Sequence, residues 1–429
     1  MKAELAVRLF DRHAGVLAID GEPRSPEDWR FAYDQAYLSA DALPLSVALP
    51  LQREPFAGAI VNNWFGNLLP EGEVRAAIAA RLRLSERDDF ALLTAIGGEC
   101  AGAVSLGPQS RPDQRELAEE TDLEALLLRL GDDAGEGAWA SLGTPRRLSL
   151  AGAQDKIAVV SQSDGRLRLP ASGEISTHIL KPESRRFRGL RDLEALGLAL
   201  ARAVGLDAVH ATLRDVAGRK ALLVERYDRQ VTNDGRAVRL HQEDFCQALG
   251  YPAELKYESQ GGPSLARCAD LIRKRLRLGP VALQGFLDWV VFNVLIGNAD
   301  AHAKNLALLS GRDGKRALAP FYDLVPILTL PDSMVDRTPA LRIGDAATIT
   351  EVSMADWRGF ALAAGYAAPF VLRRVAAMAD TVIAAAMPVA DELIAQGGEG
   401  ERLQRAVATI RENARRMQER FVHGGPAPA

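Results

Sequence analysis

A short segment in the second half of the chain, GNADAHAKN (297–305), carries polar residues at a spacing that suits phosphoryl transfer. Asp300 and Asn305 are separated by four residues, as are the catalytic aspartate and the metal-binding asparagine of protein-kinase catalytic loops. A loop of this length can direct a carboxylate at the hydroxyl to be phosphorylated and an amide oxygen at a metal ion. The alternative is a polar turn that follows the end of a helix at Ile296.

A second acidic residue, Asp323, follows this loop in the sequence APFYDLVP. The intervening stretch (306–323) has two apolar runs around a Gly-Arg-Asp-Gly turn, which predicts a β-hairpin. Such a hairpin would return Asp323 to the neighbourhood of Asn305. Carboxylate and amide oxygens are ligands that Mg²⁺ prefers, so these two residues are candidate metal ligands and Asp300 is the candidate catalytic residue. His302 is expected to be a structural hydrogen-bonding residue rather than a base.

The first half of the chain contains a candidate phosphate-binding segment, LSLAGAQDKIAVV (148–160). Its small residues Ala151, Gly152 and Ala153 precede an expected strand, and small side chains let backbone N–H groups approach phosphate oxygens. The segment has neither a G-x-G-x-x-G motif nor a P-loop lysine pattern, so a simple turn into a strand is the alternative. Lys181, which ends the apolar run in THILKP, could pair with nucleotide phosphates or lie exposed at a strand end.

Two further features would complete a nucleotide site. Glu194 lies on an expected helix and is a candidate ion-pair partner for the phosphate-binding lysine. The apolar run in LLVERYDR (222–229) ends in Glu225, Arg226 and Tyr227, which suits a hinge whose backbone groups hydrogen-bond an adenine ring. The alternative is an edge strand that runs into a loop.

The elements around these residues begin with a β-rich stretch. Short alternating apolar runs in the first 50 residues, AELAVRLF, GVLAID and PLSVALP (44–50), predict strands. Helical patterns follow over 62–84 and 88–96. The Pro- and Gly-containing GPQSRPDQ (107–114) is the expected linker.

The rest of the chain predicts a kinase-like order of elements. Between about 146 and 240, short strand patterns flank one helix over 191–205, as in a kinase small lobe, and from 241 onward the pattern is helical apart from the hairpin. We therefore expect an α+β, divergent protein-kinase-like two-lobed fold with an added β-rich N-terminal subdomain and an all-helical C-terminal lobe. The expected domains are the N-terminal subdomain (1–110), the small lobe (111–240) and the large lobe (241–429).

Composition narrows the class of protein. The 429 residues are 48% hydrophobic and 25% charged, with a formal net charge of −4, so direct, strong nucleic-acid binding through a basic surface is not expected. Three widely separated cysteines offer neither a disulfide framework nor a C-x-x-C metal pair. The charged amino terminus is unlike a signal peptide, and the most apolar run (286–297) is too short to span a membrane. A cytoplasmic location without membrane attachment is the simplest expectation.

Seven segments, in order along the chain, resemble motifs of the HipA family of serine/threonine kinase toxins. They are LSLAGAQDK, THILKP, VERYDR, HQEDFCQALG, KYESQGGP, GNADAHAKN and FYDLVP. The earlier FGNLLPEGEVR is similar to the amino-terminal region of that family. The resemblance extends from near the start to about residue 330, and it implies a serine/threonine protein kinase that uses ATP and Mg²⁺.

The resemblance also implies a role for each matching position. Asp300 would orient the acceptor hydroxyl, and Asn305 and Asp323 would bind Mg²⁺. Lys181 would bind the ATP phosphates beside the phosphate-proximal loop, and Ser149 matches the serine that members of the family autophosphorylate. The implied ATP-binding residues are Ala151, Gly152, Ala153, Gln154, Asp155, Lys156, Lys181, Glu225, Arg226, Tyr227, His302, Lys304, Asn305 and Asp323.

A toxin–antitoxin setting is implied as well. The expected partner is a small helix-turn-helix antitoxin and, through it, operator DNA, and the family's protein substrates include aminoacyl-tRNA synthetases, whose phosphorylation slows translation. Two other functions stay open: a degenerate kinase that acts as a co-repressor with its DNA-binding partner, and a small-molecule or lipid kinase on the same fold. The intact Asp300, Asn305 and Asp323 argue against the first. The lack of a basic membrane-binding helix argues against a lipid substrate.

Overall fold

The computed structural model describes residues 3–21, 25–38, 41–107, 122–129, 137–142, 150–152, 154–171, 174–184, 186–232 and 236–423. The chain forms two compact units, each built from separate stretches of sequence. Unit 1 comprises Met1–Arg185, Arg214–Ala253 and Ala307–Arg316, and unit 2 comprises Arg186–Leu213, Glu254–Leu306 and Ala317–Ala429. The three domains expected from the sequence, with boundaries at residues 110 and 240, differ from these two units and stay a prediction.

Unit 1 begins with a five-stranded antiparallel sheet of order β4-β3-β2-β1-β5. Its strands are β1 (Ala3–Leu9), β2 (Arg12–Ile19), β3 (Trp29–Tyr33), β4 (Phe56–Ala57) and β5 (Val104–Gly107). The short helices of this region are α1 (Gln35–Leu38), α2 (Ala59–Gly66), α3 (Gly72–Leu82) and α4 (Asp89–Ile96). Sheet and helices enclose one hydrophobic core drawn from residues 5 to 106. The strands expected in AELAVRLF and GVLAID and the two expected helical regions are confirmed.

The strand expected in PLSVALP (44–50) is wrong, because this segment is a loop. Side chains from other elements bind its backbone groups in place of a neighbouring strand. The Tyr33 hydroxyl accepts from the Leu45 N–H at 2.7 Å and donates to the Leu49 carbonyl at 2.6 Å. The buried Glu243 carboxylate accepts from the Val47 N–H at 3.0 Å. These contacts come from residues distant in sequence, so the local pattern of alternation could not reveal them.

A second sheet in the order β7-β6-β8-β10-β9 follows. Its strands are β6 (Ile157–Ser161), β7 (Leu167–Arg168), β8 (His178–Pro182), β9 (Ala211–Val216) and β10 (Arg219–Glu225). The helices α5 (Leu123–Arg129) and α6 (Ala138–Leu142) pack on β7 and β6, and a second hydrophobic core lies between them and the sheet. The strands expected between 146 and 240 are confirmed. The expected linker falls largely outside the described residues.

The next elements along the chain are shorter. The strands β11 (Arg229–Val231) and β12 (Ala237–Arg239) pair with each other, and β13 (His241–Asp244) leads into α8 (Phe245–Leu249). A third sheet has the order β13-β14-β15, in which β14 (Ala307–Ser310) and β15 (Arg316–Leu318) form the expected hairpin.

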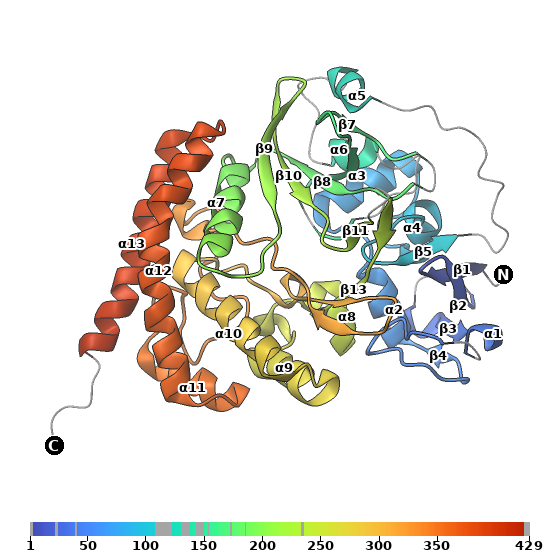
Figure 1. Ribbon diagram of the computed structural model, residues 1–429. Helices are drawn as coiled ribbons and strands as arrows, with labels where there is room; N and C mark the ends of the chain where they lie inside the picture. The colour runs from blue at the N-terminus through green and yellow to red at the C-terminus, as the bar shows by residue number, and fades with distance from the viewer. Residues whose placement is uncertain are drawn as a thin grey trace. The chain divides into compact units, whose positions relative to one another are not determined.

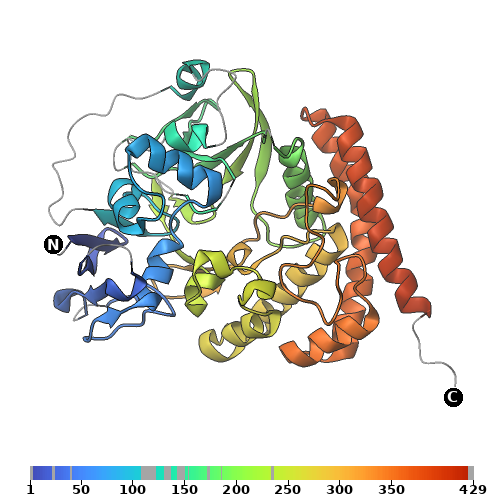
Figure 2. The same ribbon diagram turned by 180° about the vertical axis from the view of Figure 1, so that it is seen from behind.

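Unit 2 is mostly helical. The long helices α12 (Ala368–Ala395) and α13 (Gly400–His423) lie side by side in both views (Figures 1 and 2). They pack with α10 (Gly279–Ile296), and α12 also contacts α7 (Leu190–Ala203) and α11 (Met354–Ala364). The helix α9 (Leu265–Asp270) precedes α10.

Among the described helices, α10 alone has the length and apolar composition needed to cross a membrane. All of its residues from Phe286 to Ile296 are buried in the structure. This burial identifies α10 as the core helix of unit 2.

Candidate active site

The GNADAHAKN loop begins where α10 ends. Gly297 terminates the helix in the left-handed conformation, with φ of 74°, which glycine adopts without steric cost. The next residue, Asn298, is buried and donates its amide N–H to the Asn293 Oδ1 at 2.7 Å and to the Asp323 carbonyl at 3.3 Å. The buried amide of Asn298 therefore ties the start of this loop to the segment that carries Asp323.

A second contact joins the other end of the loop to the same segment. The Tyr322 hydroxyl donates to the Lys304 carbonyl at 2.5 Å, so Tyr322 and Asp323 lie next to Lys304 and Asn305. The amide nitrogen of Asn305 donates to the Asp300 carbonyl at 3.3 Å, which leaves the amide oxygen as the group a cation could use. Within unit 2, the structure thus brings Asp300, Asn305 and Asp323 into one neighbourhood.

Asp323 itself has an uncommon backbone conformation, with φ of 52°. Aspartate is one of the few residues that tolerate this left-handed region. The preceding residues hold it there: the Phe321 N–H donates to the Asp207 carbonyl at 2.8 Å, and the Val209 N–H donates to the Phe321 carbonyl at 3.0 Å. Non-glycine residues in sparsely populated conformations cluster at functional sites, which fits the proposed metal ligand.

The helix α7 packs directly on the residue after Asp323. A Cβ atom on the buried Gly197 would lie 1.8 Å from the Leu324 carbonyl oxygen and 2.8 Å from the carbonyl carbon. Only glycine permits this approach of helix and backbone. Gly197 therefore helps to set the position of the Asp323 segment, and no sequence motif indicated it.

Asp300 is exposed, and one of its carboxylate oxygens is already oriented. The Tyr257 hydroxyl donates to the Asp300 Oδ1 at 2.9 Å. The Tyr257 ring meets the His302 ring edge-on, with centroids 5.5 Å apart and an interplanar angle of 86°. His302 is buried, which agrees with a structural part in holding the loop. Tyr257 was not singled out from the sequence, although it lies in KYESQGGP, one of the motifs that carried the resemblance.

The expected phosphate loop lies in unit 1 and is closed by its own lysine. Lys156 Nζ donates to the Ala151 carbonyl at 2.7 Å, across Gly152, whose φ is 105°. The Asp155 carboxylate accepts from the N–H groups of Trp139 and Ala140 at 3.1 and 2.8 Å, so it caps α6. Gln154 lies in a bend directly before Asp155. The predicted residues Ser149 and Ala153 lie outside the described part of the chain.

Lys181 and the hinge residues are also in unit 1. Lys181 lies on β8 opposite Leu222 and is only 5% exposed, so the expected strand-end position is buried rather than exposed. Glu225 ends β10 opposite His178. Glu194 is buried on α7 in unit 2, so its pairing with Lys181 stays a prediction.

The remaining hinge residues have defined contacts. The Tyr227 hydroxyl donates to the Gln242 side-chain oxygen. The Arg226 N–H donates to the Thr177 carbonyl at 3.0 Å, and its side chain lies in a buried group of charges. Arg226 could therefore contribute to the expected hinge only through its backbone.

The donor set in unit 2 fits a magnesium ion. The Asn305 amide and the half-buried Asp323 carboxylate offer hard oxygen ligands on adjacent segments. One aspartate and one asparagine, completed by phosphate oxygens and water, is how protein kinases hold this ion.

Comparison with known proteins places this chain in a family. The model of the HipA N-terminal domain matches residues 5–107, and the model of the HipA-like C-terminal domain matches residues 148–388. HipA of Shewanella oneidensis, in a solved complex with HipB and operator DNA, superposes with a TM-score of 0.83 at 25% identity, over 99% of this chain and 100% of that one. The fold is therefore the α+β, kinase-like fold.

Curated relatives agree with the family models. "Putative kinase Y4mE" of Sinorhizobium fredii is 40% identical over 374 residues, which cover 85% of this chain and 87% of that protein. The serine/threonine-protein kinase toxin HipA of Shewanella oneidensis is 33% identical over 302 residues, covering 66% and 67%. The chain belongs to the HipA family.

Proposed function

We propose that this chain is an ATP- and Mg²⁺-dependent serine/threonine protein kinase. The observation that carries the proposal is the convergence of Asp300, Asn305 and Asp323 in unit 2, tied together by the contacts of Asn298 and Tyr322. Two carboxylates and an amide on adjacent segments match the parts that protein kinases use for phosphoryl transfer. The kinase names of the relatives support the same reaction.

In the proposed reaction, the acceptor hydroxyl oxygen forms a bond to the γ-phosphorus as the bond to the bridging oxygen of ADP breaks. The hydroxyl proton passes to the Asp300 carboxylate, which Tyr257 orients. Lys181 and the backbone of the 151–156 loop hold the phosphates. Bound magnesium supplies positive charge that offsets the charge on the transferred group. Catalysis of this kind depends mainly on positioning and electrostatics.

The biological setting is a further part of the proposal. The solved relative is in a complex with HipB and operator DNA, so we propose a HipB-like helix-turn-helix antitoxin as partner, which would bring operator DNA to this chain. An aminoacyl-tRNA synthetase is the proposed substrate, with slowed translation as the result. Autophosphorylation at Ser149 would limit the activity, because a phosphate adds nearly two negative charges close to the ATP phosphates. The proposed location is the cytoplasm.

Removal of the metal tests the reaction. The purified chain with [γ-³²P]ATP and Mg²⁺ should label itself, and excess EDTA should abolish labelling, because no phosphoryl transfer proceeds without charge neutralisation. Restoring Mg²⁺ should restore the label. Mass spectrometry of the labelled chain should locate the phosphate on Ser149. A chain that binds a HipB-like partner and ATP but incorporates no label under any of these conditions would support the co-repressor alternative.

Loss of the Tyr257 hydroxyl should slow the reaction without stopping it. Tyr257→Phe is expected to lower kcat about three- to tenfold, since it removes one hydrogen bond to a charged group at an exposed position. The acid limb of the pH–rate profile should move to higher pH, because the ionised carboxylate loses a donor that stabilises it. Steady-state assays from pH 5 to 9 measure both effects.

Tyr366→Phe is the matched control for this variant. It removes another tyrosine hydroxyl of unit 2, which donates to the Leu283 carbonyl at 2.8 Å, and it should leave kcat and the profile unchanged. A Tyr257→Phe enzyme with the kcat and pH profile of the wild type would show that this hydroxyl does not orient the base.

A further inference from the structure

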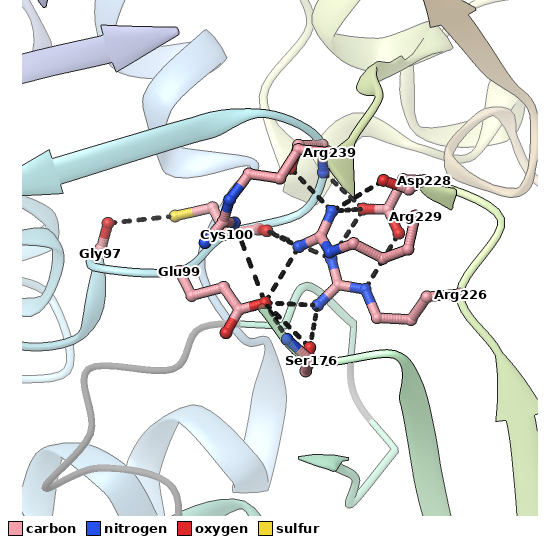
Figure 3. Close-up of polar contacts among 9 residues, drawn as sticks. Gly97, Glu99, Cys100, Ser176, Arg226, Asp228, Arg229 and Arg239 are labelled. Atoms are coloured by element: carbon pink, nitrogen blue, oxygen red, sulfur yellow. Dashed lines mark hydrogen bonds and ion pairs between the residues drawn. The ribbon is translucent and has the colours of Figure 1, made fainter. Parts of the chain in front are cut away.

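A buried group of charges in unit 1 joins the N-terminal sheet region to the hinge (Figure 3). We name it the charge cluster, and its members are Glu99, Ser176, Arg226, Asp228, Arg229 and Arg239. Glu99 comes from the loop between α4 and β5, whereas the others come from the kinase-like part of the chain. All six residues are at most 8% exposed.

A single oxygen of Glu99 receives most of the contacts. Its Oε1 accepts from the backbone N–H and the hydroxyl of Ser176 at 3.1 and 2.9 Å. The same oxygen accepts from Arg229 at 3.1 Å and from Arg226 at 3.5 Å, and lies 3.8 Å from an Arg239 nitrogen. Glu99 thus fixes the residue at the centre of the expected hinge.

Backbone groups next to Glu99 bind the same residues. The Gly102 N–H donates to the Asp228 carboxylate at 2.6 Å, and the Cys100 carbonyl accepts from Arg226 at 3.2 Å. A Cβ atom on Gly102 would lie 2.6 Å from the Gln242 nitrogen, so the loop can approach the chain beyond the hinge only with glycine here. These contacts are independent of the Glu99 carboxylate.

The cluster stays ionised at neutral pH. Burial by itself would raise the pKa of Glu99, but the surrounding guanidinium groups hold it below its usual value. Burial and the charge of Arg226 lower the pKa of Arg229 to about 10, which still leaves it protonated. Three arginines face two carboxylates, so the formal charge is +1. Buried charges of this kind are costly unless they are paired.

The N-terminal region has a second, separate contact with the nucleotide-binding segments. The Glu71 N–H donates to the Gly152 carbonyl at 3.0 Å, and Pro70 and Gly152 form a parallel bridge. This contact fixes the turn that Lys156 closes. Both segments expected to bind ATP are therefore attached to residues of the region that the HipA N-terminal domain model matches.

We propose that the N-terminal domain is a structural part of the ATP site, and that Glu99 is a positioning residue for the adenine-side hinge. Glu99 acts through Arg226 and Ser176, which fix the backbone of the hinge from the side of the N-terminal sheet. This role rests on the proposed function, because it takes residues 225–227 as the adenine-binding segment. It predicts that ATP affinity depends on a carboxylate far from the phosphates and the metal.

The test compares three variants of the full-length chain. Glu99→Gln keeps the shape of the side chain but raises the formal charge of the cluster to +2. Glu99→Gln/Arg239→Gln returns that charge to +1 without restoring the Glu99 carboxylate. Ser176→Ala removes the hydroxyl that donates to Glu99 and accepts from Arg226 while leaving all charges in place.

The expected result is a selective loss of ATP binding. Glu99→Gln should weaken ATP binding in calorimetric titrations and raise KM for ATP at least about fivefold, whereas kcat at saturating ATP should change less than about twofold, since the catalytic loop belongs to unit 2. The double variant should recover the melting temperature but keep the raised KM. Ser176→Ala should raise KM for ATP by a smaller factor. Because this variant leaves all charges in place, it is expected to fold even if Glu99→Gln does not.

Glu174→Gln is the matched control. It removes another carboxylate of unit 1, which pairs with Arg168 at 2.6 Å and accepts from the Ala171 N–H at 2.8 Å, and it should leave KM for ATP unchanged. Folded Glu99 and Ser176 variants with wild-type ATP affinity would overturn the inference, as would an equal loss in Glu174→Gln. A wild-type chain that binds no ATP would instead overturn the proposed function.

Discussion

The Asp300→Asn variant is expected to bind ATP and Mg²⁺ with wild-type affinity but to transfer phosphate at least about a hundredfold more slowly. The expectation follows from the position of this carboxylate, which is exposed, oriented by Tyr257 and adjacent to the expected metal ligands Asn305 and Asp323. An amide keeps the shape and can still accept the Tyr257 hydrogen bond, but it cannot take the proton of the acceptor hydroxyl. Positioned acid–base groups contribute about 10²- to 10⁴-fold to rates.

The experiment pairs calorimetric titration of ATP with single-turnover labelling. The control is Asp336→Asn in the same unit, since Asp336 is an exposed aspartate whose carboxylate accepts hydrogen bonds from its sequence neighbours, including the Thr338 N–H at 2.8 Å. This control should transfer phosphate at the wild-type rate. If Asp300→Asn labelled itself as fast as the wild type, the catalytic assignment of Asp300 would be wrong.

Gly197→Ala should damage both the stability and the activity of the chain. The added methyl would lie 1.8 Å from the Leu324 carbonyl oxygen, and neither the buried helix α7 nor the backbone can give way easily. Overpacking of this kind costs about 1–3 kcal/mol of unfolding free energy. Because Leu324 follows Asp323, the proposed metal ligand, displacement of the Leu324 carbonyl should also weaken Mg²⁺ binding, so that the reaction needs a higher Mg²⁺ concentration. Denaturant unfolding and titration of activity with Mg²⁺ measure the two effects.

Gly285→Ala, in the same unit, is the control and is expected to raise the stability of the chain instead. Its Cβ would have an ordinary contact, 3.8 Å from the Leu318 Cδ1 atom, so alanine should stabilise α10 by about 0.5–1 kcal/mol through its better helix propensity. Both substitutions add one methyl to a helix, and only the close approach at Gly197 distinguishes them. Equal effects of the two variants on stability would refute the packing argument.

Local sequence patterns predicted the parts of the site that depend on neighbouring residues. The apolar helix that ends at Gly297, the turn between β14 and β15, and the strand that carries Lys181 each follow from periodicity and turn residues within a few positions. These elements were expected at nearly the correct bounds. The order of the motifs then indicated the family before any coordinates.

The contacts that connect these parts could not be predicted in this way. Tyr257 reaches Asp300 from a loop before α9, and Gly197 meets Leu324 from a different helix. The Arg226 side chain lay in a segment expected to face a nucleotide, yet it is buried against Glu99. Each of these pairs is distant in sequence, and a single sequence holds no signal that specifies which distant residues touch.

The way the two units share the chain has a consequence for synthesis on the ribosome. The segment 307–316 belongs to unit 1 but emerges only after the residues of the catalytic loop, and β13 pairs with β14 from that late segment. A nascent chain that has not reached Ala307 therefore lacks both the last part of unit 1 and one of the proposed magnesium ligands, and a chain that ends between residues 316 and 322 still lacks that ligand. Because domains generally fold as units, no fragment that ends before Asp323 carries the whole proposed phosphoryl-transfer apparatus. Any activity of this chain thus begins only after residue 323 has been translated.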